Sequence, residues 1–332
     1  IFYSRRIGLF NNEPVNILGG ARLTGKIGKF DVGLINMQTE KYSSEHPSEN
    51  FNVLRVKRAV INPYSYAGGI FTSRIRPGGN NDITYGFDTF INTAGDNYVE
   101  MKISQTFSSG KDYKHLMDNT YLRYNMESSN NNKGWSYRAS FDWLGRDYEP
   151  AMGYLQRGNV FIPNGNVRYS WMPGERSFLF YHKVNYKAAA YFNTDGSFET
   201  LITGPGYEFE TKNKIFAGID PEFRREIIMD TFYIGSKTYI PEGAYSFLVA
   251  KGFINTPASA RFLVNSEFEI GQYYDGSVVS IKAKPMWSLS GSFRLEGQYL
   301  YNLVSIPSRQ QKYLSHVAGI KLTYMLNTKL SA

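Results

Sequence analysis

The chain has 332 residues, 16% of them aromatic, and a formal net charge of +8. It contains no cysteine, and its four histidines match no zinc-ligand spacing, so we expect neither a disulfide nor a metal or other cofactor. Basic residues are interspersed with acidic ones and form no long run, which argues against nucleic-acid binding.

Hydropathy limits the ways in which the chain could cross a membrane. No stretch approaches the roughly 18 to 20 unbroken apolar residues of a spanning helix. The mean hydropathy of −0.38 is still compatible with a membrane β-barrel, in which only every second residue of a strand faces lipid. Residues 1 to 6 contain no signal peptide, which for an exported protein implies removal or truncation.

Several windows alternate between apolar and polar residues with a period of two, which predicts strands with one apolar face and one charged face. In chain order these windows begin near residues 99, 135, 262, 279 and 293. Helical spacing fits none of them. We expect the charged faces to line a polar interior through Glu100, Lys102, Arg138, Asp142, Glu267, Glu269, Lys282, Lys284, Arg294 and Glu296.

Aromatic side chains concentrate near the ends of the apolar faces, where the interfacial belts of a membrane barrel lie. Such belts contact lipid at the level of the headgroups. The sequence predicts lipid-facing belt positions for Trp135, Trp143, Phe178, Phe192, Trp287, Tyr299 and Tyr301.

Turn residues separate the predicted strands, as at Gly95-Asp96, Asp195-Gly196 and Asp275-Gly276, and longer polar loops follow alternate strands in the first half of the chain. One end of the structure should then carry long loops and the other short turns. The alternation is lost around residues 195 to 239, and the count is about 18 strands. We expect an open interior, with a plug formed by loops such as residues 145 to 158 as the alternative.

These features predict one all-β domain over residues 1–332, a transmembrane antiparallel up-and-down β-barrel. The competing class is a soluble propeller or sandwich. Many alternating runs last about 9 to 13 residues, whereas soluble strands average about 5 to 6. Charges of both signs on the polar faces also fit a wet interior better than a dry core.

Three short motifs are similar to a known family. Residues 2–8 (FYSRRIG), 19–26 (GGARLTGK) and 68–72 (GGIFT) resemble the C-terminal barrel region of a Bacteroidetes outer-membrane family catalogued as domain of unknown function 5916. In that family a module similar to family 9 carbohydrate-binding modules usually precedes the barrel, which implies a glycan ligand bound outside this chain. The terminal aromatic strand of such barrels is missing, so we expect an incomplete stretch of a longer chain, whose closed barrel has more strands.

Other motifs that could carry chemistry have simpler explanations. Residues 20 to 26 have the spacing of a phosphate-binding loop, but Ile27 replaces the magnesium-binding Ser or Thr and a strand follows, so we expect a hairpin turn. Glu267 and Glu269 share one strand face and do not form a separable acid and nucleophile pair. Of the adjacent Arg5 and Arg6, at most one can face the interior. We expect no enzyme activity here; any hydrolase activity would lie outside this chain.

Three functions fit these expectations, all in the outer membrane of a Gram-negative bacterium. The first, which we favour, is a porin-like channel or transport barrel, nearly unselective because its interior carries both charge signs. The second is a scaffold or accessory subunit of a larger outer-membrane complex. The third is the membrane anchor of a carbohydrate-binding or glycan-processing protein. The expected partners are outer-membrane lipid and lipopolysaccharide, and other outer-membrane proteins.

Overall fold

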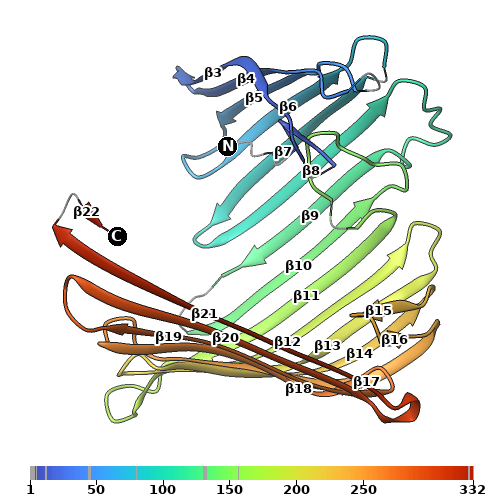
Figure 1. Cartoon of the computed structure of the whole chain (residues 1–332). Coiled ribbons are helices and arrows are strands. Elements are labelled where there is room, and N and C mark those ends of the chain that lie inside the picture. Colours follow the sequence, from blue (N-terminus) through green and yellow to red (C-terminus); the bar gives the residue numbers. More distant parts are fainter. Residues whose placement is uncertain are drawn as a thin grey trace. The chain divides into compact units, whose positions relative to one another are not determined.

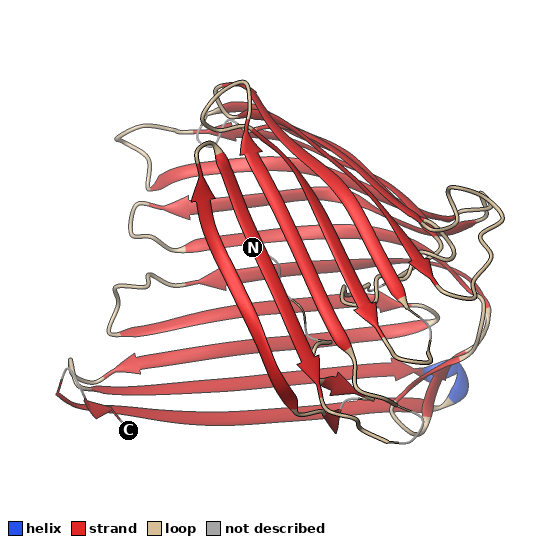
Figure 2. Ribbon diagram, turned by 90° about the horizontal axis from the view of Figure 1, so that it is seen from above, coloured by secondary structure: helices blue, strands red, loops and turns tan. Residues whose placement is uncertain are grey.

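The chain is an all-β protein (Figures 1 and 2). The computed structural model describes residues 4, 6–11, 13–43, 46–79, 81–129, 133–155, 157–327 and 330–331. Within these residues the one helical element is a single 3₁₀ turn, η1, at Pro307–Arg309 (Figure 2). No helix in this described part is long and apolar enough to cross a bilayer. The predicted all-β class is confirmed.

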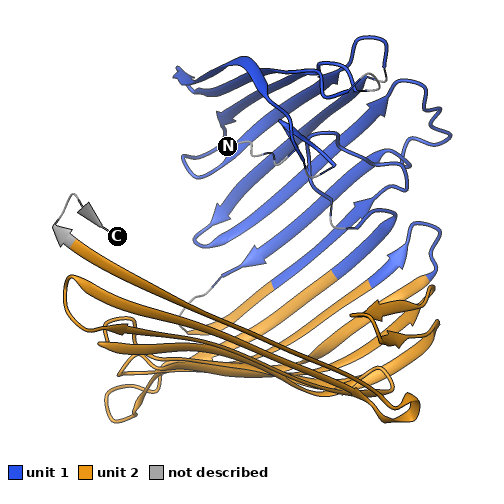
Figure 3. Ribbon diagram, in the orientation of Figure 1, with its two compact units in different colours: residues 1–129, 138–163, 191–197 blue, residues 130–137, 164–190, 198–332 orange. Residues whose placement is uncertain are grey.

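Seventeen long strands, β3 to β14 and β17 to β21, form an antiparallel up-and-down sheet in the described residues, close to the expected number (Figure 1). Contacts divide the chain into two compact units (Figure 3). Unit 1 is Ile1–Ser129, Arg138–Pro163 and Tyr191–Ser197, and unit 2 is Asn130–Tyr137, Asn164–Ala190 and Phe198–Ala332. Closure into a barrel and organisation as a single domain stay predictions.

In unit 1 each strand from β3 to β9 pairs with the next one along the chain. Short turns at residues 28–29 and 95–96 alternate with long connections at residues 40–49 and 109–119, as predicted. The strands are β1 Leu9–Phe10, β2 Glu13–Pro14, β3 Ile17–Ile27, β4 Phe30–Thr39, β5 Asn50–Ala59, β6 Tyr66–Ile75, β7 Asp82–Ala94, β8 Asn97–Ser108 and β9 Thr120–Ser128. Three further strands contribute residues to both units, β10 Gly134–Leu144, β11 Val160–Trp171 and β12 Leu179–Asn193.

The glycine-rich motif at residues 20 to 26 lies inside β3, so its prediction as a hairpin turn is wrong. The turn comes later, at Gly28-Lys29, where Gly28 has the positive φ of 59° that a tight turn requires. The prediction failed because the glycines were taken as turn residues that end a strand, whereas here they lie within β3. Of the first motif, Phe2, Tyr3 and Arg5 lie outside the described residues, and Arg6 precedes β1.

Unit 2 contains the second half of the meander and one extra hairpin. β13 pairs with β14, β14 with β17, and each strand from β17 to β21 with the next. The short β15–β16 hairpin lies within the connection from β14 to β17, which explains why the alternation was lost in this region. The strands are β13 Phe198–Thr211, β14 Phe216–Ile228, β15 Phe232–Ile234, β16 Thr238–Ile240, β17 Gly243–Asn255, β18 Phe262–Tyr273, β19 Gly276–Ser288, β20 Phe293–Ile306, β21 Gln311–Asn327 and β22 Leu330–Ser331.

In both units the sheet has one polar face and one apolar face. Residues opposite each other in the antiparallel ladder share a face, so the register assigns the strands from β3 to β9, and those from β13 to β21 in the main ladder, consistently. The apolar side chains stay exposed to the surroundings instead of packing into a core. Examples are Leu54 at 40% exposure, Phe87 at 68% and Ile103 at 48% in unit 1, and Leu248 at 59%, Ile270 at 52% and Ile320 at 81% in unit 2.

Prolines interrupt the pairing of β13 with β14. Pro205 and Pro221 have no backbone donor, and the ladder is broken between Thr203 and Tyr207 without a change in register. Gly204 allows the two strands to stay close at this point, because an added Cβ would overlap the carbonyl oxygen of Pro221.

We therefore expect Gly204→Ala to destabilise the fold by about 1–3 kcal/mol, the usual cost of inserting a methyl group into filled space. Urea unfolding in detergent micelles, followed by tryptophan fluorescence, measures the loss. Gly319→Ala in β21 is the matched control, since no heavy atom lies within 4 Å of its added Cβ. Equal unfolding midpoints for the two variants would contradict the close approach at Gly204.

Candidate functional site: the polar faces of the two units

Ion pairs form within and between strands on the polar face of unit 1. On β8, Lys102 Nζ lies 2.6 Å from Glu100 Oε1. On β9, Arg123 Nε lies 3.7 Å from Glu100 Oε2, and Arg123 Nη1 lies 3.4 Å from Oδ1 of Asp142 on β10. Arg138 precedes Asp142 by four residues on the same strand and so projects from the same face. The four interior positions predicted in this unit therefore share one face.

A further pair on this face was missed by the sequence analysis. Arg55 on β5 makes a two-point contact with Asp88 on β7, with Nη2 donating to Oδ2 at 2.7 Å. The guanidinium passes over Gly68 on β6, where an added Cβ would come within 3.0 Å of Arg55 Nη2. Gly68 belongs to the GGIFT motif, so the motif was the available signal for a side chain crossing at this point.

In unit 2 the polar face is organised around Glu222 on β14, which is only 4% exposed. Its Oε1 lies 2.9 Å from Lys187 Nζ, and its Oε2 lies 2.7 Å from Arg224 Nη2 and 3.5 Å from Lys251 Nζ. A carboxylate this buried needs such partners, because an unpaired charge would be strongly destabilising. Glu222 falls in the region where the strand count was lost. The alternation of Asp220, Glu222 and Arg224 was nevertheless readable in the sequence.

The six interior positions predicted in unit 2 also share one face. Glu267 pairs in register with Lys282, and Lys282 Nζ donates to both carboxylate oxygens, at 2.8 and 3.0 Å. Glu296 lies 3.7 Å from Lys321, its partner across β20 and β21. The register places the set of Glu267, Glu269, Lys282, Lys284, Arg294 and Glu296 on this face. Whether the face lines an interior stays a prediction.

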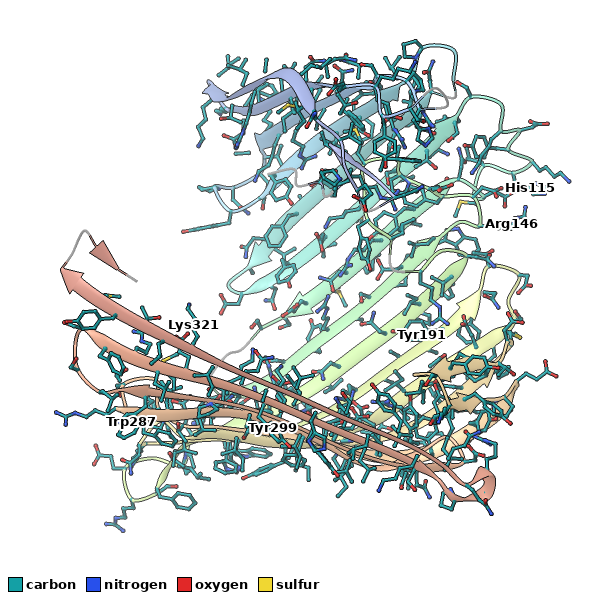
Figure 4. All side chains as sticks on the ribbon, viewed as in Figure 1. His115, Arg146, Tyr191, Trp287, Tyr299 and Lys321 are labelled. Atoms are coloured by element: carbon teal, nitrogen blue, oxygen red, sulfur yellow. The ribbon has the colours of Figure 1, made fainter. Side chains whose placement is uncertain are left out.

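The predicted belt aromatics lie on the apolar faces or beside them. The register places Trp287, Tyr299 and Tyr301 on the apolar face of unit 2 and Lys321 on its polar face. Figure 4 labels Trp287, Tyr299 and Lys321. The ring centroids lie 5.0 Å apart for Trp135 and Tyr169, 6.1 Å apart for Trp143 and Phe161, and 6.4 Å apart for Phe161 and Phe192. Phe178 directly precedes β12 and is 72% exposed. Contact of these rings with lipid stays a prediction.

Residues 145–155, which we call the inner loop, lie against the polar face of unit 1. The Tyr148 hydroxyl is 2.7 Å from Ser104 Oγ, and the Glu149 amide donates to Thr106 Oγ1 at 3.2 Å. Met152, 2% exposed, packs with Phe51 and Val53 of β5. The inner loop thus covers part of this face, while the open interior stays a prediction.

In unit 2 the β15–β16 hairpin, the inner hairpin, lies in the same way on the polar face (Figure 1). Ile240 is completely buried and belongs to one cluster with Val249, Val278, Val304 and Ile306. The register places Val249, Val278 and Val304 on the polar face. Apolar residues at polar-face positions thus provide the surface on which the hairpin docks.

Arg309 and Asp275 tie the inner hairpin to two turns of the sheet. Arg309, in η1, makes a two-point contact with Asp275 in the β18–β19 turn, and its Nη2 also donates to the Tyr239 carbonyl oxygen at 3.1 Å. The Tyr239 amide in turn donates to Gln311 Oε1 at 3.1 Å. Burial opposes ionisation of Asp275, but hydrogen bonds and attraction from Arg309 outweigh it and lower the pKa of this carboxyl. We call this group of contacts the latch.

The described residues show no group of three or more His, Asp or Glu side chains arranged to hold a metal ion. The phosphate-loop spacing at residues 20 to 26 lies within β3, with no helix after it, so the backbone amides that would bind phosphate are engaged in the ladder.

Comparisons with known proteins add little to this geometry. No family model matches the chain, and no curated protein matches it in sequence. The chain is similar to a solved structure titled "Bacterial polysaccharide outer membrane secretin", with 9% sequence identity, a TM-score of 0.40, and 91% of this chain and 100% of that chain covered. A likeness this weak carries no argument about function. The resemblance to the domain of unknown function 5916 family stays a prediction.

The lowered pKa of Asp275 makes the latch sensitive to acid. The contribution of such a carboxylate is complete above its unfolded pKa of about 3.9 and is lost as the pH falls through the folded value. Hydrogen-exchange protection of the inner-hairpin amides should therefore be constant from neutral pH to about pH 5 and fall below about pH 4. In Asp275→Asn the protection should be low throughout. Asp195→Asn in the β12–β13 turn, where the carboxylate accepts a hydrogen bond from the Ser197 amide, is the control and should behave like the parent chain.

Proposed function

We propose that the chain is an integral outer-membrane barrel with a polar, water-accessible interior that acts as a channel or transport barrel. The observation that carries this proposal is the division of the sheet into an exposed apolar face and a charged, paired polar face. Soluble monomers rarely expose apolar patches larger than a few hundred Å². A bilayer removes the cost of exposing such a face.

Strand length supports the same proposal. The long strands of unit 1 range from β9 with 9 residues to β7 with 13, and β20 in unit 2 has 14. A tilted strand needs about 9–11 residues to cross the apolar layer, whereas soluble strands average about 5–6. A soluble sandwich or propeller would also bury its apolar faces against another sheet.

The inner loop and the inner hairpin favour a narrowed passage over a wide pore. Both lie on polar faces beside paired charges of both signs, which should give little ion selectivity, with at most a slight anion preference from the net charge of +8. The scaffold and glycan-anchor functions are the alternatives, and complete occlusion of the interior would favour them. Catalysis is not part of this proposal.

Adjacent residues on β19 test which face of the sheet contacts lipid. Ile281, 44% exposed on the apolar face, should tolerate a charge poorly, and Ile281→Lys should destabilise the membrane-inserted protein by about 2–4 kcal/mol. Ser280→Lys is the matched control, since the register places Ser280 opposite Glu269 on the polar face. Unfolding by denaturant in lipid vesicles gives both values. Similar losses at the two positions would indicate a soluble two-layer packing.

Single-channel recording tests the passage. The complete chain should conduct in planar bilayers, and replacing residues 231–241 with a short Gly-Ser linker should give larger current steps because the inner hairpin no longer narrows the interior. The same linker in place of residues 257–261, which lie within the connection between β17 and β18, should leave the steps unchanged. Insertion without current in all three proteins would overturn the channel proposal in favour of a scaffold.

A further inference from the structure

The apolar face of unit 1 contains a groove of about 620 Å³ that is lined by residues of β4 to β9. Its walls include Val56, Ala67, Gly69, Phe87, Met101 and Ile103. The register places all six on the apolar face, so the groove opens away from the charged side. Its volume is within the range of sites that hold small molecules.

The groove exists because small residues lie between large ones. An added Cβ at Gly69 would have its nearest neighbours at 3.6 Å, which is ordinary contact, so a side chain would fit there. Phe87 stands beside it with 68% exposure. The two glycines of the GGIFT motif thus act on opposite faces. Gly68 admits the Arg55 side chain on the polar face, and Gly69 leaves the hollow on the apolar face.

One end of the groove is cationic. Arg58 is the second-last residue of β5, pairs in register with Ala67, and lies over the Phe30 ring at 5.2 Å from its centroid. Its side chain is exposed, and no carboxylate among the described residues lies within ion-pair distance of it. The rest of the lining is almost entirely apolar and extends from this strand end toward the middle of the strands.

We propose that this groove binds one anionic glycerophospholipid, with an acyl chain along Gly69 and Phe87 and the phosphate on Arg58. This inference rests on the proposed membrane location. A free cation at a strand end and an apolar channel leading away from it match the two parts of such a lipid. The end concerned carries the short β3–β4 and β7–β8 turns, which in outer-membrane barrels face the periplasm. The lipid therefore comes from the periplasmic leaflet.

Titration with defined lipids tests the groove. The complete protein is delipidated in detergent and titrated with phosphatidylglycerol or with phosphatidylcholine of the same acyl chains, and bound lipids are counted by native mass spectrometry. The parent chain should bind one phosphatidylglycerol at a roughly tenfold lower concentration than phosphatidylcholine, the effect of one charge-assisted contact. Gly69→Val, which fills the groove, and Arg58→Gln, which removes the cation, should each abolish this preference.

Two matched variants serve as controls. Gly25→Val adds a side chain to the apolar face of β3, where no heavy atom lies within 4 Å of the added Cβ. Arg225→Gln removes another exposed arginine that lies over a ring, that of Phe198, at 5.8 Å. Both should keep the parent preference.

Three outcomes would overturn the groove as a lipid site: equal affinity for the two lipids, loss of the preference in the controls as well, or a co-purifying protein displaced by Gly69→Val. Failure of the membrane proposal is separable, because a chain that does not insert into lipid vesicles fails before any lipid is counted. Insertion with no selective lipid overturns the groove alone.

Discussion

The pleat of the β-strand is the constraint on which the rest of this structure depends. Successive side chains project to opposite faces, so a register shift of one residue would move every apolar side chain to the charged face. The ladder also pairs the backbone donors and acceptors within the sheet, which a chain surrounded by lipid requires. Because both conditions are met along β3 to β9 and again along β13 to β21, the apolar faces can remain uncovered.

Charge pairing follows from this arrangement. Acidic and basic residues that alternate with apolar ones all reach the same face, where each lies opposite or diagonal to residues of the next strand. Exposed pairs such as Lys282 with Glu267 contribute little to stability. Glu222 differs because it is buried, and its contacts with Lys187, Arg224 and Lys251 offset the cost of removing it from water. Such a network favours one register over its neighbours.

The alternation of apolar and polar residues is broken where the inner loop and the inner hairpin pack on the sheet. Phe51, Val53 and Val249 are apolar residues at polar-face positions, and each packs under a segment that folds back over the sheet. The latch shows how such a segment is held, since Arg309 contacts both a turn aspartate and a hairpin carbonyl. The covered parts of the polar faces and the groove at Gly69 on the apolar face therefore have the same origin, a residue of unexpected size or polarity within a regular strand.

The sequence by itself determined the all-β class, the approximate strand number, and the face of each charged residue in the windows where it was applied, because these depend on local periodicity. It also located most turns, although glycines inside β3 were mistaken for one. Only the tertiary structure decided that Arg55 meets Asp88 over Gly68, that Glu222 gathers three cations, and that Met152 and Ile240 are buried on polar faces. These contacts join residues far apart in the chain, and their partners are selected by register and by the path of each loop. A period of two residues carries no information about either.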